Sequence, residues 1–313
     1  MSLPVRSSAS IFQIRTAIVA VFIGYLVLIA GCRTSEDAAA AATQMSATAK
    51  SLSDYYAALS IILSDTDQIY SLNEAMYSKP YSKESRQELK TTGAELAKRI
   101  TLAADLSTLA GSFAKLTGSS SPADVAAAGN KLETEVDNLA SYNASTGEQN
   151  AIKSALQLFV TAVQAHKEHE AAQAMDSLAS GLSALFDKEA DSWKSVDDVY
   201  VQLAATLAGN LVDQNAADNS AMLKPALDPF GLTPSAPAPD LNTKLATLTK
   251  QQISTRQAAL VTSYSNATDA MSKSLHEMSQ RIHMVATDKP MAFRLPPVTV
   301  ATVEQWATQV LSY

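Results

Sequence analysis

The chain has 313 residues, of which 47% are hydrophobic and 6% aromatic, and it carries a formal net charge of -7 with a single cysteine. Such an acidic chain is poorly suited to nucleic acid or to a second, electrostatic attachment to anionic lipid, because both present negative charge. One cysteine excludes an intramolecular disulfide, so the fold must be stabilised by packing. The few glycines and the many Ala, Leu, Ser, Thr, Gln and Lys residues predict a helical protein with a sizeable core.

The N-terminus has the layout of an export signal. Arg6 and Arg15 lie in a segment without acidic residues, and Thr16 to Ala30 is an almost uninterrupted apolar run. As a helix this run reaches only about 22 Å at about 1.5 Å per residue, short of the roughly 30 Å hydrocarbon core of a bilayer. The run is therefore too short for a comfortable permanent membrane span.

The apolar run ends in Leu28-Ile29-Ala30-Gly31-Cys32. This stretch resembles the lipobox of bacterial lipoproteins, in which small residues such as Ala30 and Gly31 admit a signal peptidase and a cysteine thiol is alkylated. The resemblance implies cleavage before Cys32, a diacylglycerol on its sulfur and usually a further acyl chain on the new amine. It covers only the N-terminus and assigns the mature domain to no family. The alternative is an uncleaved anchor in which Cys32 is a buried bystander.

Cys32 is accordingly the expected lipidation site and the expected membrane attachment. At about 0.8 kcal/mol per buried methylene, one acyl chain holds a protein marginally and two or more hold it stably. Arg33 stands where many lipoproteins that stay at the inner membrane have aspartate. By that analogy we expect the outer membrane, facing the periplasm, in preference to the inner membrane or the cell surface.

Long helical patterns dominate the sequence after Cys32. We expect an Ala-rich stalk over residues 32–45, with its helix beginning near Ser35. Apolar residues then recur every three or four positions from Met45 to Met76, which predicts one helix of about forty residues. Pro80 should end it.

Two shorter patterns follow the first helix. One runs from about Ser82 to Leu116. The other is Ala-rich and extends to about Leu139, with Ser121 as its N-cap and Pro122 as its first helical residue.

The longest pattern begins where Ser145 and Glu148 have the spacing of a capping box and extends to about Ala217. One continuous helix and two helices with a break within residues 187–192 fit this pattern equally well. The sequence leaves the number of helices here open.

Five prolines interrupt the chain between Met222 and Asp240 and favour extended, polyproline-like backbone. This segment is either a long loop at one end of the bundle or a partner-binding segment with Phe230 and Leu232 as exposed anchors. Asp240 should cap the next helix. A short helix from about Thr299 should lie across the bundle end and bury Trp306.

These patterns predict an all-α protein, an elongated antiparallel bundle of about four long helices with shorter extras. The expected organisation is a signal peptide (1–31), the stalk (32–45), the bundle (46–220), a Pro-rich loop (221–240), a long helix that completes the bundle (241–288) and a Pro-containing tail with a short helix (289–313).

Four histidines are the weak candidates for a metal or haem site: His166, His169, His276 and His283. Pairs at i,i+3 and i,i+7 share helix faces, so two helices could bring them together. However, the chain has neither Glu-x-x-His nor His-x-x-x-His, the patterns of di-iron carboxylate and zinc peptidase sites. Solvated histidines at the margin of the core are the simpler interpretation, and we expect no metal.

No motif for catalysis is found. The chain has no Gly-x-Ser-x-Gly, phosphate-binding glycine loop or dinucleotide fingerprint, and an acylated Cys32 is no nucleophile. We expect a protein that is not an enzyme and has no cofactor besides the covalent lipid on Cys32. The tyrosines of the first helix and its turn either line a ligand groove or, as the simpler expectation, sit at the core boundary with their hydroxyls in water: Tyr55, Tyr56, Tyr70, Tyr77 and Tyr81.

Three classes of function remain. The first is a structural, scaffold or adaptor lipoprotein that presents its bundle to a protein partner in the bacterial envelope. The second is a binding or sensory module with a small ligand between its helices, which requires a cavity lined by Tyr70 or Trp193. The third is a membrane-active helical protein, although the sequence after Cys32 contains no apolar run approaching twenty residues.

Overall fold

A computed structural model describes residues 9–77, 80–115, 121–137, 146–165, 167–287 and 300–312, with side chains throughout these ranges except at 9–36, 137, 146–149 and 168. All regular elements in the described ranges are helical. Four helices are long: α1 (Ala9–Tyr77), α2 (Lys83–Ala114), α5 (Glu168–Asp213) and α7 (Pro239–Ala286). The shorter ones are α3 (Pro122–Asp137), α4 (Thr146–Gln164), α6 (Lys224–Leu227) and α8 (Ala301–Leu311). The all-α class and the set of four long helices are confirmed.

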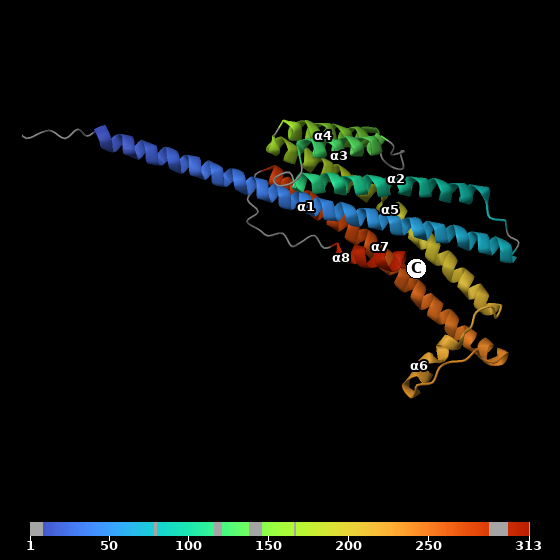
Figure 1. Ribbon diagram of the computed structural model, residues 1–313. Helices are drawn as coiled ribbons and strands as arrows, with labels where there is room; N and C mark the ends of the chain where they lie inside the picture. The colour runs from blue at the N-terminus through green and yellow to red at the C-terminus, as the bar shows by residue number, and fades with distance from the viewer. Residues whose placement is uncertain are drawn as a thin grey trace, which may run out of the picture.

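The long helices form two antiparallel hairpins, α1 with α2 and α5 with α7, which pack on each other mainly through α1 (Figure 1). The shorter α3 and α4 connect α2 to α5, and α8 lies along α1 and α7. In Figure 1 the N-terminal part of α1 projects from one end of the bundle, and the hairpin of α5 and α7 reaches away at the other end, with α6 near its tip. The molecule is therefore elongated, with two distinct ends.

Small side chains set the close approach of α1 and α2. Ser46 Oγ donates to the Ser107 carbonyl and Ser107 Oγ donates to the Ser46 carbonyl, each at 2.8 Å. A Cβ added to Gly111 would lie 3.3 Å from Ser46 Oγ. Backbones this close leave no room for larger residues, which explains the Ser- and Ala-rich seams of these helices.

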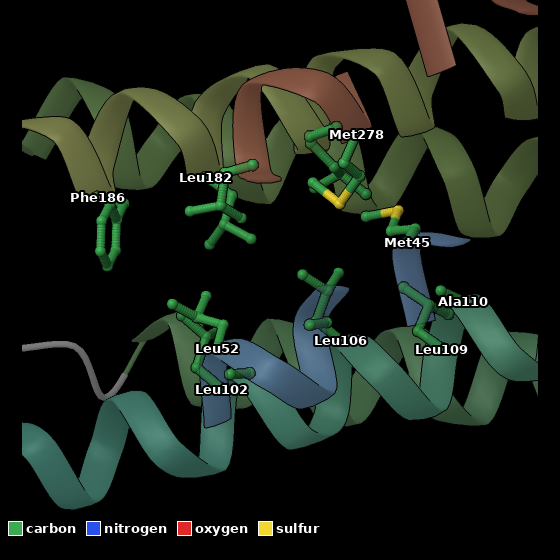
Figure 2. Packing of buried hydrophobic residues seen from close by; sticks show 14 of the residues in the cluster. Met45, Leu52, Leu102, Leu106, Leu109, Ala110, Leu182, Phe186 and Met278 are labelled. Atoms are coloured by element: carbon green, nitrogen blue, oxygen red, sulfur yellow. The ribbon is translucent and has the colours of Figure 1, made fainter. Parts of the chain in front are cut away.

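The apolar core lies where the two hairpins meet. Figure 2 shows Leu182 and Phe186 of α5 facing Leu52 of α1 and Leu102 of α2, all buried. Met278 of α7 joins the same cluster. Each large side chain buried in this way contributes about 1.5–3 kcal/mol relative to exposure, so this layer holds the hairpins together.

A ladder of polar pairs fixes the register of α5 and α7. Lys194 Nζ lies 2.6 Å from Asp269 Oδ1, and Lys250 Nζ lies 2.6 Å from Asp213 Oδ1 near the far end of α5. Surface pairs of this kind are each worth only about 0–1 kcal/mol, so they align the helices more than they stabilise them.

The helix boundaries correct several expectations. α1 begins at Ala9 and continues through the stretch in which a start near Ser35 was expected, because no proline interrupts the chain between the apolar run and the Ala-rich sequence after Asp37. Residues 148–217 contain two helices, α4 and α5, and the chain reverses between Gln164 and Glu168 rather than within 187–192. α5 remains continuous there because Glu189 is neutralised in the core by an arginine of α2.

The C-terminal third departs from the expectations at three further points. The Pro-rich segment is not extended throughout, since short turns at Ser220–Leu223, Lys224–Leu227 and Asp228–Phe230 precede its irregular part. The N-cap of α7 is Ala238, not Asp240, because Pro239 takes the first helical position. α8 runs along the side of α1 and α7 instead of across the bundle end, although Trp306 is buried as expected.

The other helix starts agree with the sequence. Ser82 caps α2 by accepting a hydrogen bond from Ser85 N, and Ser121 Oγ accepts one from Asp124 N at the start of α3. The capping residue Ser145 lies outside the described residues.

Candidate functional site

The lipobox-like stretch lies within α1, whose backbone is helical from Ala9 onward, while the side chains of Leu28 to Cys32 lie outside those described. Among the described side chains of α1, Ala41 is the first that is buried in the core, and it follows Cys32 by nine positions. At about 1.5 Å per residue these positions span about 14 Å. Lipidation of Cys32 stays a prediction, with the attachment point close to the near end of the bundle. Among the described side chains, no helix is long and apolar enough to cross a membrane.

Two of the four histidines belong to the surface ladder between α5 and α7. His276 Nε2 lies 3.3 Å from Asp187 Oδ2, and His283 Nδ1 lies 2.9 Å from Asp176 Oδ2, both at exposed positions between α7 and α5. The His169 ring contacts Gln173, one turn further along α5, and His166 lies outside the described residues. Within the described part of the chain, no three or more His, Cys, Asp or Glu residues are grouped so that they could hold a metal.

Two of the tyrosines lie deeper than expected. Tyr55 and Tyr56 are buried, and the Tyr55 hydroxyl is 2.9 Å from Thr268 Oγ1 in the interior. Burial raises the pKa of both phenols well above the ordinary value. The expectation of hydroxyls in water is therefore wrong for this pair, whose rings pack on Phe186 of α5.

Tyr70 and Tyr81 form a second aromatic pair near the turn between α1 and α2. Their rings are stacked with centroids 4.5 Å apart, and the Arg86 guanidinium lies 4.6 Å from the centre of the Tyr81 ring. Burial raises the pKa of Tyr81 to about 12. These contacts place the Tyr70 ring beside the space between α1, α2 and α5.

A buried cluster of charged side chains connects α2 to α5. Arg99 Nε donates to Glu189 Oε2 at 2.9 Å, and Arg99 Nη2 contacts Glu189 Oε1. Glu95 accepts from the same guanidinium and from Lys98. Burial alone would lower the pKa of Arg99, but hydrogen bonds and attraction from Glu189 leave it raised. The guanidinium also lies 5.5 Å from the centre of the Trp193 ring. Trp193 is fully buried and is therefore a core residue of α5.

Asp197 is the second buried acid of α5. It is 1% exposed, and neither carboxyl oxygen has a hydrogen-bond partner among the described residues. Burial and the nearby Asp198 charge raise its pKa well above the ordinary value. An uncompensated carboxylate is expensive in such a place, so the neutral acid is the form that this environment favours.

A cleft of about 450 Å³ opens between α1, α2 and α5. Its walls carry Leu63, Leu89, Val196 and Val199, and Tyr70 lines one side. Two acids also line it from facing helices, Glu88 of α2 and Asp191 of α5, and both are exposed. This is the cavity that a ligand-binding module requires, and Tyr70 but not Trp193 is among its lining residues.

Two buried threonines complete the cleft. Thr66 of α1 and Thr92 of α2 line it at 1% and 6% exposure. Thr66 Oγ1 donates to the Ile62 carbonyl at 2.7 Å, so it can only accept a further hydrogen bond. The Thr92 hydroxyl makes no hydrogen bond within the described ranges. The cleft is therefore lined by two carboxylates, apolar side chains and the neutral oxygens of two buried threonines.

A second cavity, of about 550 Å³, lies between α1, α5, α7 and α8, and Val310 of α8 is one of its lining residues. Small and apolar residues dominate it, among them Ala204, Ala208 and Leu260. It also carries polar residues such as Asp65 and Arg256, but its lining surface is more apolar than that of the cleft beside Tyr70. We therefore regard the cleft of α1, α2 and α5 as the candidate ligand site.

Sequence reasoning missed the buried charges, although a signal was present. Glu189 and Asp197 fall on the same helical face as Phe186 and Trp193, at spacings of three and four. An acid in register with an apolar seam indicates either a buried partner or a raised pKa. The partner of Glu189 on α2 was not predictable, because it depends on how two hairpins pack.

Comparison with known proteins gives no family for the chain: no protein-family model, curated protein sequence or solved structure matches it. Its function is therefore argued from the arrangement of its own residues.

Proposed function

We propose that the protein is a lipid-anchored envelope lipoprotein with a structural or adaptor role, which presents an elongated bundle to a protein partner and performs no catalysis. The observation that carries this proposal is that the two ends of the elongated molecule differ. The expected attachment, Cys32, precedes the bundle on α1, whereas exposed apolar residues gather at the opposite end of the hairpin of α5 and α7.

Contacts between α1 and α7 support this separation of the two ends. Arg281, near the end of α7, donates to Gln44 Oε1 at 2.7 Å, and Gln44 follows Cys32 on α1 by only twelve positions. α7 begins at Pro239, 42 positions earlier, which corresponds to about 63 Å at about 1.5 Å per residue. The Pro-rich tip would thus stand well away from a membrane that holds Cys32.

The tip carries the most accessible aromatic residue among the exposed hydrophobic residues described. Phe230 is 77% exposed and Leu232 is 56% exposed, and Leu241 and Leu248 in the first part of α7 are exposed as well. Clusters of exposed apolar residues commonly mark protein contacts, in which aromatic side chains are enriched. This favours the tip as the surface that meets a partner and supports the partner-binding interpretation of the Pro-rich segment.

The anchor is tested by Cys32→Ser in cells grown with labelled fatty acid. We expect the wild-type protein to carry the label and to sediment with membranes, and the variant to do neither in processed form. A processed variant that still carried label or stayed on membranes would refute the anchor.

The adaptor role is tested by photo-crosslinking in cells. A photoreactive residue at Phe230 or Leu232 should give a discrete heteromeric product. Leu158, which is 64% exposed on α4, provides a matched control position and should give none. If no position on any helix face captured a partner, the adaptor role would be wrong even if the anchor were right.

A further inference from the structure

We propose that the cleft between α1, α2 and α5 binds a linear aliphatic triamine, whose two terminal ammonium groups lie at Glu88 and Asp191, at opposite ends of the cleft. The central nitrogen lies beside Thr66 and Thr92. The proposal rests only on residues that line the cleft, so it is independent of the lipid anchor and goes beyond the adaptor role.

The directions of the helices set the two acids apart. α1 and α2 form an antiparallel hairpin, as described above. α5 runs parallel to α1, since the ring of Tyr55 packs on that of Phe186 and, further along both helices, Tyr77 accepts a hydrogen bond from Gln214. α2 and α5 are therefore antiparallel to each other, with the cleft between them.

The contact of Arg99 with Glu189 relates the heights of the acids along the cleft. Glu88 precedes Arg99 on α2 by eleven positions, and Asp191 follows Glu189 on α5 by two. In antiparallel helices both steps lead the same way, so the acids differ in height by nine positions, about 14 Å at about 1.5 Å per residue. Helical side chains lean toward the N-terminus of their own helix, which moves these carboxylates still further apart. One ammonium group therefore cannot reach both.

Each acid can accept a cation of its own. Glu88 and Asp191 are exposed, and neither forms an ion pair or hydrogen bond with a described residue. A charge-assisted hydrogen bond of about 2.8 Å at each end leaves about 8 Å or more between the two ammonium nitrogens. An extended chain advances roughly 1.2 Å per bond, so three- or four-carbon spacers on both sides of a central nitrogen, which separate the terminal nitrogens by about 10–12 Å, span this gap.

Two buried threonines lie near the middle of this span. Thr92 follows Glu88 on α2 by four positions, about 6 Å in height. On α1, Leu63 is level with Gly93, since a Cβ on that glycine would lie 3.4 Å from Leu63 Cδ2. Thr66, three positions beyond Leu63, is thus within about 3 Å of the height of Thr92. Leu63 and the other apolar lining residues bury the carbon spacers.

The two hydroxyls select a nitrogen in the middle of the chain. Thr66 Oγ1 already donates to the Ile62 carbonyl, so it can only accept. Thr92 is 6% exposed, and its hydroxyl has no partner among the described residues. A ligand that displaces water from Thr92 must replace the lost hydrogen bond, which a methylene cannot do. A secondary amine can, in either protonation state: its N–H donates to Thr66, and a second N–H or its lone pair meets Thr92.

Calorimetric titration of the full chain in a non-ionic detergent at fixed ionic strength tests the two-ended site. The linear seven-carbon diamine places its nitrogens about 10 Å apart. We expect it to bind at least about tenfold more tightly than heptylamine, which has one charge, and than the four-carbon diamine, which has equal charge but is too short. Equal affinity for the two diamines, or for the seven-carbon diamine and heptylamine, would overturn the proposal.

Single variants test the ends separately. Glu88→Gln and Asp191→Asn should each weaken binding of the seven-carbon diamine about tenfold, but binding of heptylamine, which can use the remaining acid, by about twofold at most. Glu135→Gln with Asp240→Asn removes charge from α3 and α7, outside the cleft, and should leave both affinities unchanged. Equal losses for the two ligands, or a loss of diamine binding in the control variant, would refute the two-ended site.

The central nitrogen is tested with the symmetric triamine that has two three-carbon spacers and the length of the seven-carbon diamine. We expect it to bind about fivefold or more tightly than that diamine. Thr92→Val, which nearly keeps the shape of the side chain, should leave the far-UV circular dichroism spectrum and diamine affinity unchanged and abolish the preference for the triamine. A wild type without this preference, or a variant that keeps it, would refute the triamine as the ligand class.

Discussion

Arg99 of α2 and Glu189 of α5 form a two-pronged ion pair in the interior of the bundle, with Nε 2.9 Å from Oε2 and Nη2 in contact with Oε1. Their side chains are 2% and 0% exposed. The pair joins the two hairpins at a level where apolar residues otherwise form the contact. Such a pair contributes little net stability relative to apolar residues, but it penalises any packing that separates the partners.

We therefore predict that Arg99→Met lowers the free energy of unfolding by about 3–5 kcal/mol, because Glu189 is left as an uncompensated buried charge. The double variant Arg99→Met with Glu189→Leu should lose less than Arg99→Met alone. Urea unfolding followed by circular dichroism measures these two variants and Glu189→Leu alone. A double variant whose loss equals the sum of the two single losses would contradict the coupling.

A second prediction concerns Asp197 and pH. Its pKa is raised in the folded protein by burial and by Asp198, so the stability associated with its neutral form is fully present below the ordinary Asp pKa of about 4 and is lost as pH rises through the folded value. Asp197→Asn, which is uncharged at every pH, should unfold at a higher urea concentration than the wild type at pH 8.

The gain from Asp197→Asn should shrink as the pH is lowered toward about 4, where the wild-type acid is neutral in the folded state and only about half ionised in the unfolded state. Asp240→Asn, at an exposed position in the first turn of α7, is the control and should show no such pH-dependent gain. A stabilisation by Asp197→Asn that is the same at both pH values would mean that the pKa of the carboxyl does not differ between the folded and unfolded protein.

Periodicity in the sequence was sufficient for the helices and much of the core, because an apolar seam such as that of α1 reports directly which face is buried. Periodicity did not predict the break between α4 and α5, since the charged residues around Lys167 resemble the solvent-exposed face of a continuous helix. The site was harder still. Thr66, Thr92 and Asp191 are unremarkable in sequence and become a cleft only when α1, α2 and α5 pack, so Tyr70 was the only lining residue of the site that could be named beforehand.

Two helical glycines are expected to respond oppositely to alanine. A Cβ at Gly129 of α3 would lie 2.3 Å from Val160 Cγ2 of α4, and the stiff valine side chain has little freedom to move away. A Cβ at Gly209 of α5 meets nothing within 4 Å. Gly209→Ala should therefore raise the free energy of unfolding by about 0.5–1 kcal/mol through helix propensity, whereas Gly129→Ala should lower it by about 1–3 kcal/mol through overpacking.

The two glycine variants are compared by thermal unfolding under the same conditions. Val160→Ala, which removes the clashing methyl groups, should recover part of the loss when combined with Gly129→Ala. If both glycine variants stabilised the protein, the close packing of α3 on α4 would be wrong.

The last prediction tests the position of α8 on the side of the bundle. Trp306 is 3% exposed, and its ring centre lies 5.2 Å from that of Tyr55 and 5.7 Å from that of Tyr264. Trp306→Ala should lower the free energy of unfolding by about 3–5 kcal/mol, because it leaves a cavity between α1 and α7. Trp306→Phe should lose less, since the indole N–H has no hydrogen-bond partner among the described residues.

Leu311→Ala, at a 47% exposed position of the same helix, is the control and should change stability by no more than about 0.5 kcal/mol. Urea unfolding of the three variants decides the matter, and equal effects of Trp306→Ala and Leu311→Ala would show that α8 does not pack on Tyr55 and Tyr264.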